Sequence, residues 1–81
     1  MIIKVLGRDQ ESCQALATAV RQAVHDLMLH ATIEEITDSR TIVGFGVRNT
    51  PALVVDGKVV VSGRLPTAAE VQALLAVAPA S

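Results

Sequence analysis

The chain contains one cysteine, Cys13, which is its candidate for covalent chemistry. It follows Asp9, a residue type that caps helix N-termini, so it falls in the first turn of an expected helix. The helix dipole there favours a thiolate, which would attack disulfides or form a mixed disulfide with a partner. The neighbouring charges disagree, because Arg8 would favour the thiolate whereas Asp9 and Glu11 would oppose it.

Cys13 also fits a purely structural role. It shares an apolar stripe, in steps of three and four residues, with Leu16, Ala17 and Val20. Free cysteines are among the most buried residue types, and a thiol in an apolar setting is inert. The residues alone therefore leave both roles of Cys13 open.

Other residues with chemical potential predict no metal or cofactor site. His25 and His30 are five residues apart, so they are not expected on one helix face, and no third ligand follows at metal spacing. Glu34 and Glu35 are adjacent carboxylates, but neighbours in a strand point to opposite faces, which predicts a solvated edge strand. Gly44-Phe45-Gly46 lacks the following helix and the Lys-Ser/Thr of a phosphate loop.

Composition narrows the classes of partner. The formal net charge is −1 and there is a single aromatic residue, so we expect no nucleic-acid partner, which would need a basic surface and stacking platforms. No apolar run reaches the roughly 20 residues of a membrane span. The first six residues enter an apolar segment directly, without the pattern of a secretory signal. One unpaired cysteine fits a reducing compartment, and we expect a cytoplasmic protein.

The elements that must position these residues follow from hydrophobic periodicity and turn chemistry. Strands are predicted at residues 1–6 and 31–37, a long helix at 10–29 and a short helix at 38–43. Asp56-Gly57 predicts a tight hairpin, because both turn positions favour positive φ. The hairpin strands are 52–55 and 58–61, and a final helix follows Thr67, which begins a capping box.

The predicted order is thus β-α-β-α-β-β-α. A strand, a crossover helix and a strand form a parallel, right-handed unit, whereas the hairpin adds two antiparallel strands. We therefore expect one α/β domain over residues 1–81, with a mixed four-stranded sheet flanked by helices. The apolar run Val59-Val60-Val61 falls on an expected edge strand, where a second copy of the chain could pair to give a homodimer.

Two segments carry a resemblance to a known family. The run from Thr50 to Gly63, together with Val5-Leu6-Gly7 leading to Cys13, resembles the small redox-active disulfide proteins of thioredoxin fold over nearly the whole chain. That family places a Cys-x-x-Cys at the start of the first helix. The matching residues here are Gln10-Glu11-Ser12-Cys13, so Gln10 replaces the first cysteine. Because dithiol exchange needs two thiols, the resemblance implies a relative without that activity of its own.

The resemblance also assigns a role to Thr50-Pro51. In the family this proline is cis and lies beside the Cys-x-x-Cys, and the backbone of the preceding residue pairs with bound peptides. A plain structural turn is the alternative for these two residues. Two functions follow: a thiol-redox role through Cys13 alone, or a non-catalytic module that binds a protein or peptide at Thr50-Pro51 or self-associates. Whether the chain is an enzyme stays open at this stage.

Overall fold

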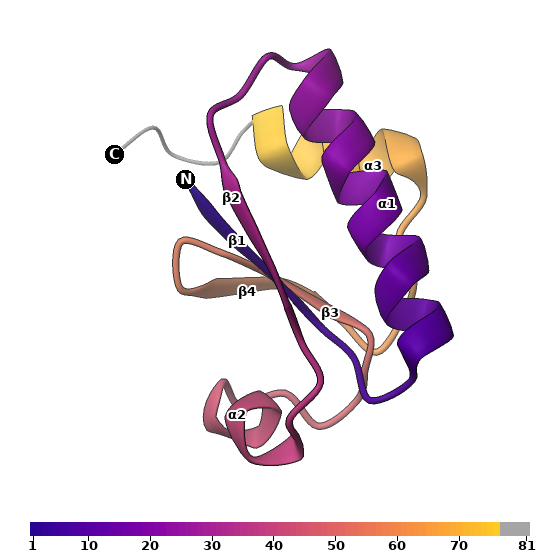
Figure 1. The fold of residues 1–81 in the computed structure, drawn as a ribbon, viewed down its shortest axis with the longest axis vertical. Coiled ribbons are helices and arrows are strands. Elements are labelled where there is room, and N and C mark those ends of the chain that lie inside the picture. Colours follow the sequence, from indigo (N-terminus) through magenta and orange to yellow (C-terminus); the bar gives the residue numbers. More distant parts are fainter. Residues whose placement is uncertain (77–81) are drawn as a thin grey trace.

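A computed structural model describes residues 1–76 of the chain. Its elements follow the predicted β-α-β-α-β-β-α order and confirm the α/β class (Figure 1). They are β1 (Ile2–Leu6), α1 (Gln10–Asp26), β2 (Thr32–Ile36), α2 (Ser39–Gly44), β3 (Ala52–Val55), β4 (Lys58–Ser62) and α3 (Ala68–Ala76). The last part of the expected final helix and the C-terminal tail, residues 77–81, lie outside the described residues.

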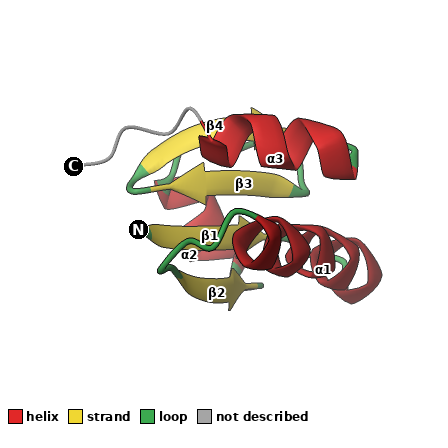
Figure 2. Ribbon diagram, turned by 90° about the horizontal axis from the view of Figure 1, so that it is seen from above, coloured by secondary structure: helices red, strands yellow, loops and turns green. Residues whose placement is uncertain are grey.

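The strands form the mixed four-stranded sheet that was expected, in the order β2-β1-β3-β4. β1 pairs with β2 in parallel and with β3 antiparallel, and β3 pairs antiparallel with β4. β2 and β4 are therefore the two edges of the sheet, so residues 59–61 lie in an edge strand as predicted. Viewed from above, α1 and α3 lie on one side of the sheet (Figure 2).

Apolar side chains on the two faces of the sheet make two cores. On the α1 and α3 face, Ile3 and Val5 of β1 pack with residues of α1, α3 and the hairpin. On the other face, Leu6 packs with Ile42 of α2 and with Ala52 and Val54. Each fully buried aliphatic side chain stabilises the fold by about 1.5–3 kcal/mol, so β1 and β3, the inner strands that both contribute to the two cores, are the central elements.

The hairpin between β3 and β4 follows its sequence signal. Asp56 and Gly57 adopt φ values of 49° and 84°, as expected for an Asp-Gly turn. Asp56 also ties the turn to β1, because its Oδ1 accepts a hydrogen bond from the Ile2 N–H at 2.8 Å and its own N–H donates to the Ile2 carbonyl at 2.8 Å. The turn is thereby fixed to the start of the central strand.

Local capping decides where the helices begin. The Asp9 carboxylate accepts a hydrogen bond from the Glu11 N–H at 3.2 Å, which satisfies a free donor of α1. Thr67 does the same for α3, since its Oγ1 accepts from the Glu70 N–H at 3.1 Å, and Arg64 forms an ion pair with Glu70. No helix within residues 1–76 is long and apolar enough to cross a membrane.

α1 ends at Asp26, three residues before the predicted end. Met28 adopts φ 54°, and its N–H donates to the His25 carbonyl at 3.2 Å. The N–H of Leu29 donates to the Val24 carbonyl at 3.0 Å. These two bonds form a Schellman motif, which normally has glycine at the left-handed position. Methionine is not a residue type that predicts a helix end. Hydrophobic periodicity alone therefore placed the predicted end of the helix too far along the chain.

Replacing Met28 with glycine should therefore stabilise the protein. A left-handed conformation costs a non-glycine residue about 1 kcal/mol, and the Met28 side chain, in a residue 87% exposed, has little packing to lose. We expect Met28→Gly to raise the free energy of unfolding by about 0.5–1 kcal/mol in urea denaturation followed by circular dichroism. Met28→Ala keeps the backbone penalty and should leave stability unchanged; an equal gain in both variants would contradict this explanation.

Candidate functional site

Cys13 lies four residues into α1 and points away from solvent. Its N–H donates to the Asp9 carbonyl at 3.0 Å, so it is already part of the helical ladder and is not a free donor of the first turn. The residue is 1% exposed and belongs to the core between α1 and the sheet. Its Sγ lies 3.9 Å from the Val5 carbonyl oxygen of β1, an acceptor for the thiol proton.

Glu35 of β2 lies beside the Cys13 thiol. Its Oε1 is 3.8 Å from Cys13 Sγ, and its Oε2 is 3.0 Å from an Nη of Arg21. As expected, Glu34 and Glu35 are both exposed on an edge strand and point to opposite faces of the sheet. Glu35 aligns with Val5 in the parallel register, so it lies on the α1 face, while only Glu34 points to the opposite side. The sequence indicated that the two carboxylates lie on opposite faces of the strand. The strand register determined which of them lies beside the cysteine.

The surroundings of Cys13 hold it in the neutral form. Burial raises the pKa of the Cys13 thiol, and the nearby negative charge of Glu35 and its hydrogen bond raise it further. The thiolate-favouring effect expected from the first helical turn does not prevail, because the side chain is buried against β1 and faces a carboxylate. Of the two roles left open by the sequence, the geometry favours the unreactive, core thiol.

Gln10 is the first residue of α1 and is exposed. Together with Cys13 it borders a small, mostly polar hollow between the start of α1 and the end of β2. The residues that line the hollow are Arg8, Gln10, Cys13, Gln14, Glu35 and Thr37. The amide of Gln10 has neither an ionisable group nor a nucleophilic atom of thiol character, so this end of α1 supplies hydrogen bonds rather than a second thiol.

Thr50 and Pro51 lie at the same end of the sheet as the start of α1. Leu6, which leads into α1, pairs with Ala52, which follows Pro51. Arg8 donates from its guanidinium to the Arg48 carbonyl at 3.3 Å, which links the two loops directly. The register thus brings together the two segments that the sequence analysis selected, although 40 residues separate these hydrogen-bonded partners.

The Thr50–Pro51 peptide bond is cis. Pro51 is buried, and its carbonyl accepts a hydrogen bond from the Gly63 N–H at 3.0 Å, which attaches it to the end of β4. Thr50 is half-buried, and within residues 1–76 no hydrogen bond uses its backbone N–H or C=O. Backbone groups that find no partner in a folded chain are available to a bound one.

Comparison with known proteins places this arrangement in a family. The model for the thioredoxin domain matches residues 1–76. A curated protein named thioredoxin, from Methanothermobacter thermautotrophicus, is 32% identical over 75 residues, which cover 93% of this chain and 97% of that protein. The chain belongs to the thioredoxin family. The family match supports the thioredoxin-like fold over residues 1–76.

A glycine sets the distance between β1 and α1 in this thioredoxin-family chain. A Cβ on Gly7 would lie 2.9 Å from Cys13 Cβ and 3.3 Å from Cys13 Cα. Neither atom is the flexible end of a side chain, so no small rotation could relieve the contact. The absence of a side chain at Gly7 is therefore what lets the first helix pack close enough to bury its cysteine.

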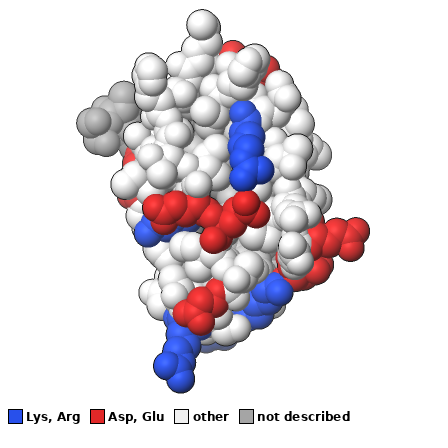
Figure 3. Space-filling model, in the orientation of Figure 1, with Lys and Arg blue, Asp and Glu red and all other residues white. Residues whose placement is uncertain are grey.

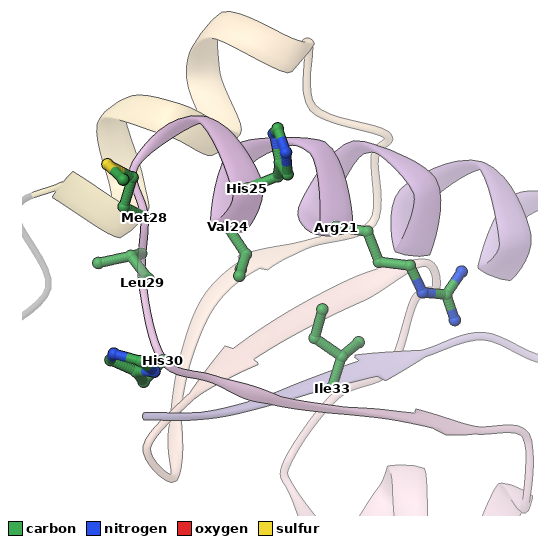
Figure 4. A pocket seen from close by; sticks show the side chains of 7 residues that line it. All are labelled: Arg21, Val24, His25, Met28, Leu29, His30 and Ile33. Atoms are coloured by element: carbon green, nitrogen blue, oxygen red, sulfur yellow. The ribbon is translucent and has the colours of Figure 1, made fainter.

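A second hollow lies at the other end of α1 (Figure 4). Its apolar part is formed by Val24, Met28, Leu29 and Ile33, and Arg21, His25 and His30 border it. Both histidines are exposed, and although they are five residues apart they line the same hollow. The helix ends before His30, so helical spacing does not apply to it. Residues 1–76 contain no group of three His, Cys, Asp or Glu side chains that could hold a metal ion.

Charged side chains of both signs are interspersed on the face shown in Figure 3. One basic side chain there lies above acidic ones (Figure 3). Arg21 of α1 forms an ion pair with Glu35 of β2 at 3.0 Å. This distribution agrees with a formal net charge of −1. That face shows no extended patch of basic side chains (Figure 3).

Gly7→Ala should destabilise this thioredoxin-family protein. The new methyl group would meet the Cys13 backbone and Cβ, and overpacking of this kind costs about 1–3 kcal/mol. Gly44→Ala is the matched control, because a Cβ there meets no atom within 4 Å and alanine favours the helix. Urea denaturation followed by circular dichroism measures both variants. Equal stabilities for the two would show that the contact between β1 and α1 is not tight.

Proposed function

We propose that the chain is a thioredoxin-family binding module that performs no dithiol exchange of its own and docks an extended peptide segment through the backbone of Thr50. The observation that carries the proposal is the free N–H and C=O of Thr50, half-buried beside Pro51. An extended segment would pair with these groups as strands pair in a sheet, with main-chain hydrogen bonds supplying affinity.

The absence of dithiol exchange follows from the balance of the reaction. Reducing a partner disulfide to two thiols requires the oxidation of two thiols to a disulfide on the reducing protein. Within these 81 residues only Cys13 carries sulfur of that kind, and Gln10 stands where the family places the first thiol. A single unpaired thiol also supports a reducing, cytoplasmic location.

A monothiol role is the second candidate. The hollow lined by Gln10 and Glu35 reaches Cys13, which gives a partner disulfide a route to the sulfur. Attack by the Cys13 thiolate would form a mixed disulfide and release one partner thiolate. This candidate ranks second because the residue is 1% exposed and its thiol pKa is raised. A homodimer through the open edge of β4 is the alternative partner arrangement.

Peptide docking can be mapped by nuclear magnetic resonance. Peptides selected by phage display against the protein are titrated into labelled protein, and we expect the amide shifts to centre on residues 48–52 and 63. Thr50→Ser, which keeps the backbone groups, should bind as the wild-type protein does, whereas Thr50→Pro, which removes the N–H, should bind more weakly. Shifts centred on β4, or a failure to select any binder, would contradict the proposal.

Restoring the missing thiol tests the chemical part of the proposal. Positions 10 and 13 are one turn apart on the same helix face, so Gln10→Cys should gain disulfide reduction in an insulin assay with dithiothreitol. The wild-type protein and Gln10→Ser should show only the background rate. Turnover by the wild-type protein that disappears in Cys13→Ser would overturn the proposal and support the monothiol role.

A further inference from the structure

Peptide docking at Thr50 leaves one cluster of ionisable groups without a role. Cys13, Glu35 and Arg21 come from α1 and β2 and form a chain of contacts: sulfur to carboxylate at 3.8 Å, carboxylate to guanidinium at 3.0 Å. Glu35 occupies a position on the α1 face of β2, two residues from Ile33, which packs against the core. Although its residue is exposed, Glu35 therefore faces α1 and the sulfur rather than the opposite side of the sheet.

We propose that Glu35 is a positioning residue that keeps Cys13 in its protonated, unreactive form, with Arg21 holding the carboxylate over the sulfur. The inference goes beyond the docking function and does not depend on it. Glu35 controls the one cysteine of the chain from β2, outside the two loops of the candidate site.

The hydrogen-bond geometry around the sulfur carries the argument. Two acceptors face Cys13 Sγ, the Val5 carbonyl oxygen at 3.9 Å and Glu35 Oε1 at 3.8 Å. Within residues 1–76 no N–H or O–H donates to the sulfur. A thiol can donate its proton to either acceptor. A thiolate has no proton to donate and would be repelled by the lone pairs of both oxygens. The groups around the sulfur therefore favour the thiol over the thiolate.

Arg21 does not offset this arrangement, because its guanidinium lies on the far oxygen of the carboxylate. It pairs with Glu35 Oε2, whereas Oε1 faces the sulfur. The pair holds the carboxylate in place, with its other oxygen directed at the sulfur. Arg8, at the border of the same hollow, donates to the Arg48 carbonyl. These are the charged groups that line the hollow or contact the cluster directly.

The consequence is a thiol whose reactivity depends on the carboxylate. Burial already disfavours the Cys13 thiolate and the charge of Glu35 disfavours it further, so removing that charge raises the fraction of thiolate, which is the reacting form. The Arg21 side chain is 56% exposed and the Glu35 side chain 37%, so solvent reaches both more readily than the sulfur, whose residue is 1% exposed.

The test is a pH titration of the Cys13 thiolate in the folded protein, followed by its ultraviolet absorbance. The chain has no Tyr or Trp, so the background is low, and Cys13→Ala supplies the blank. We expect Glu35→Gln to lower the titration midpoint and to give at least about threefold more thiolate at any pH well below it, equivalent to half a pH unit. Glu35→Thr, a strand-favouring residue, should shift the midpoint in the same direction.

Two controls separate the contact from net charge. Glu34→Gln removes the same charge from the same strand on the opposite face and should leave the midpoint unchanged. Arg21→Met in the Glu35→Gln background should add no further shift, because Arg21 acts through the carboxylate. An unchanged midpoint in both Glu35 variants, or an equal shift in Glu34→Gln, would overturn the proposal, and a further shift from Arg21→Met would overturn the role of Arg21. Circular dichroism confirms folding across the titration.

Discussion

The close packing of α1 against β1 is the constraint on which the other features depend. β1 is paired on both sides, by β2 in parallel and by β3 antiparallel, and its side chains serve the cores on both faces. Gly7 lets the chain turn from this strand into α1 with the helix almost in contact with it. Because Gly7 allows this close approach, the start of α1 lies against the sheet and Cys13 is buried.

The same packing gives the candidate site its chemical character. A cysteine near a helix N-terminus is a candidate thiolate on electrostatic grounds, but here the side chain turns toward the Val5 carbonyl and a carboxylate. Desolvation and a negative neighbour outweigh a partial positive charge whose effect decays within one turn. The other half of the site, Thr50 beside Pro51, is brought to the same end of the sheet by the β1–β3 register.

At the opposite end of α1, backbone hydrogen bonds hold an exposed residue in an unfavourable conformation. Met28 takes a left-handed backbone conformation that glycine would adopt without strain, and it presents an apolar side chain to solvent. The hydrogen bonds of the Schellman motif hold this conformation, and contacts of the surrounding chain compensate for its energy. Such helix ends depend on hydrogen bonds between backbone groups, which side-chain periodicity does not encode.

The sequence by itself determined the order of elements, the Asp56-Gly57 turn and the caps at Asp9 and Thr67, because each depends on residues close together in the chain. It also determined that only one thiol is available. Tertiary structure alone decided that Glu35, rather than Glu34, meets the cysteine, since a shift of one residue in strand register exchanges the two faces. It likewise decided that Cys13 is buried and that His25 and His30 share a hollow, because burial and long-range contacts arise only when the strands and helices pack.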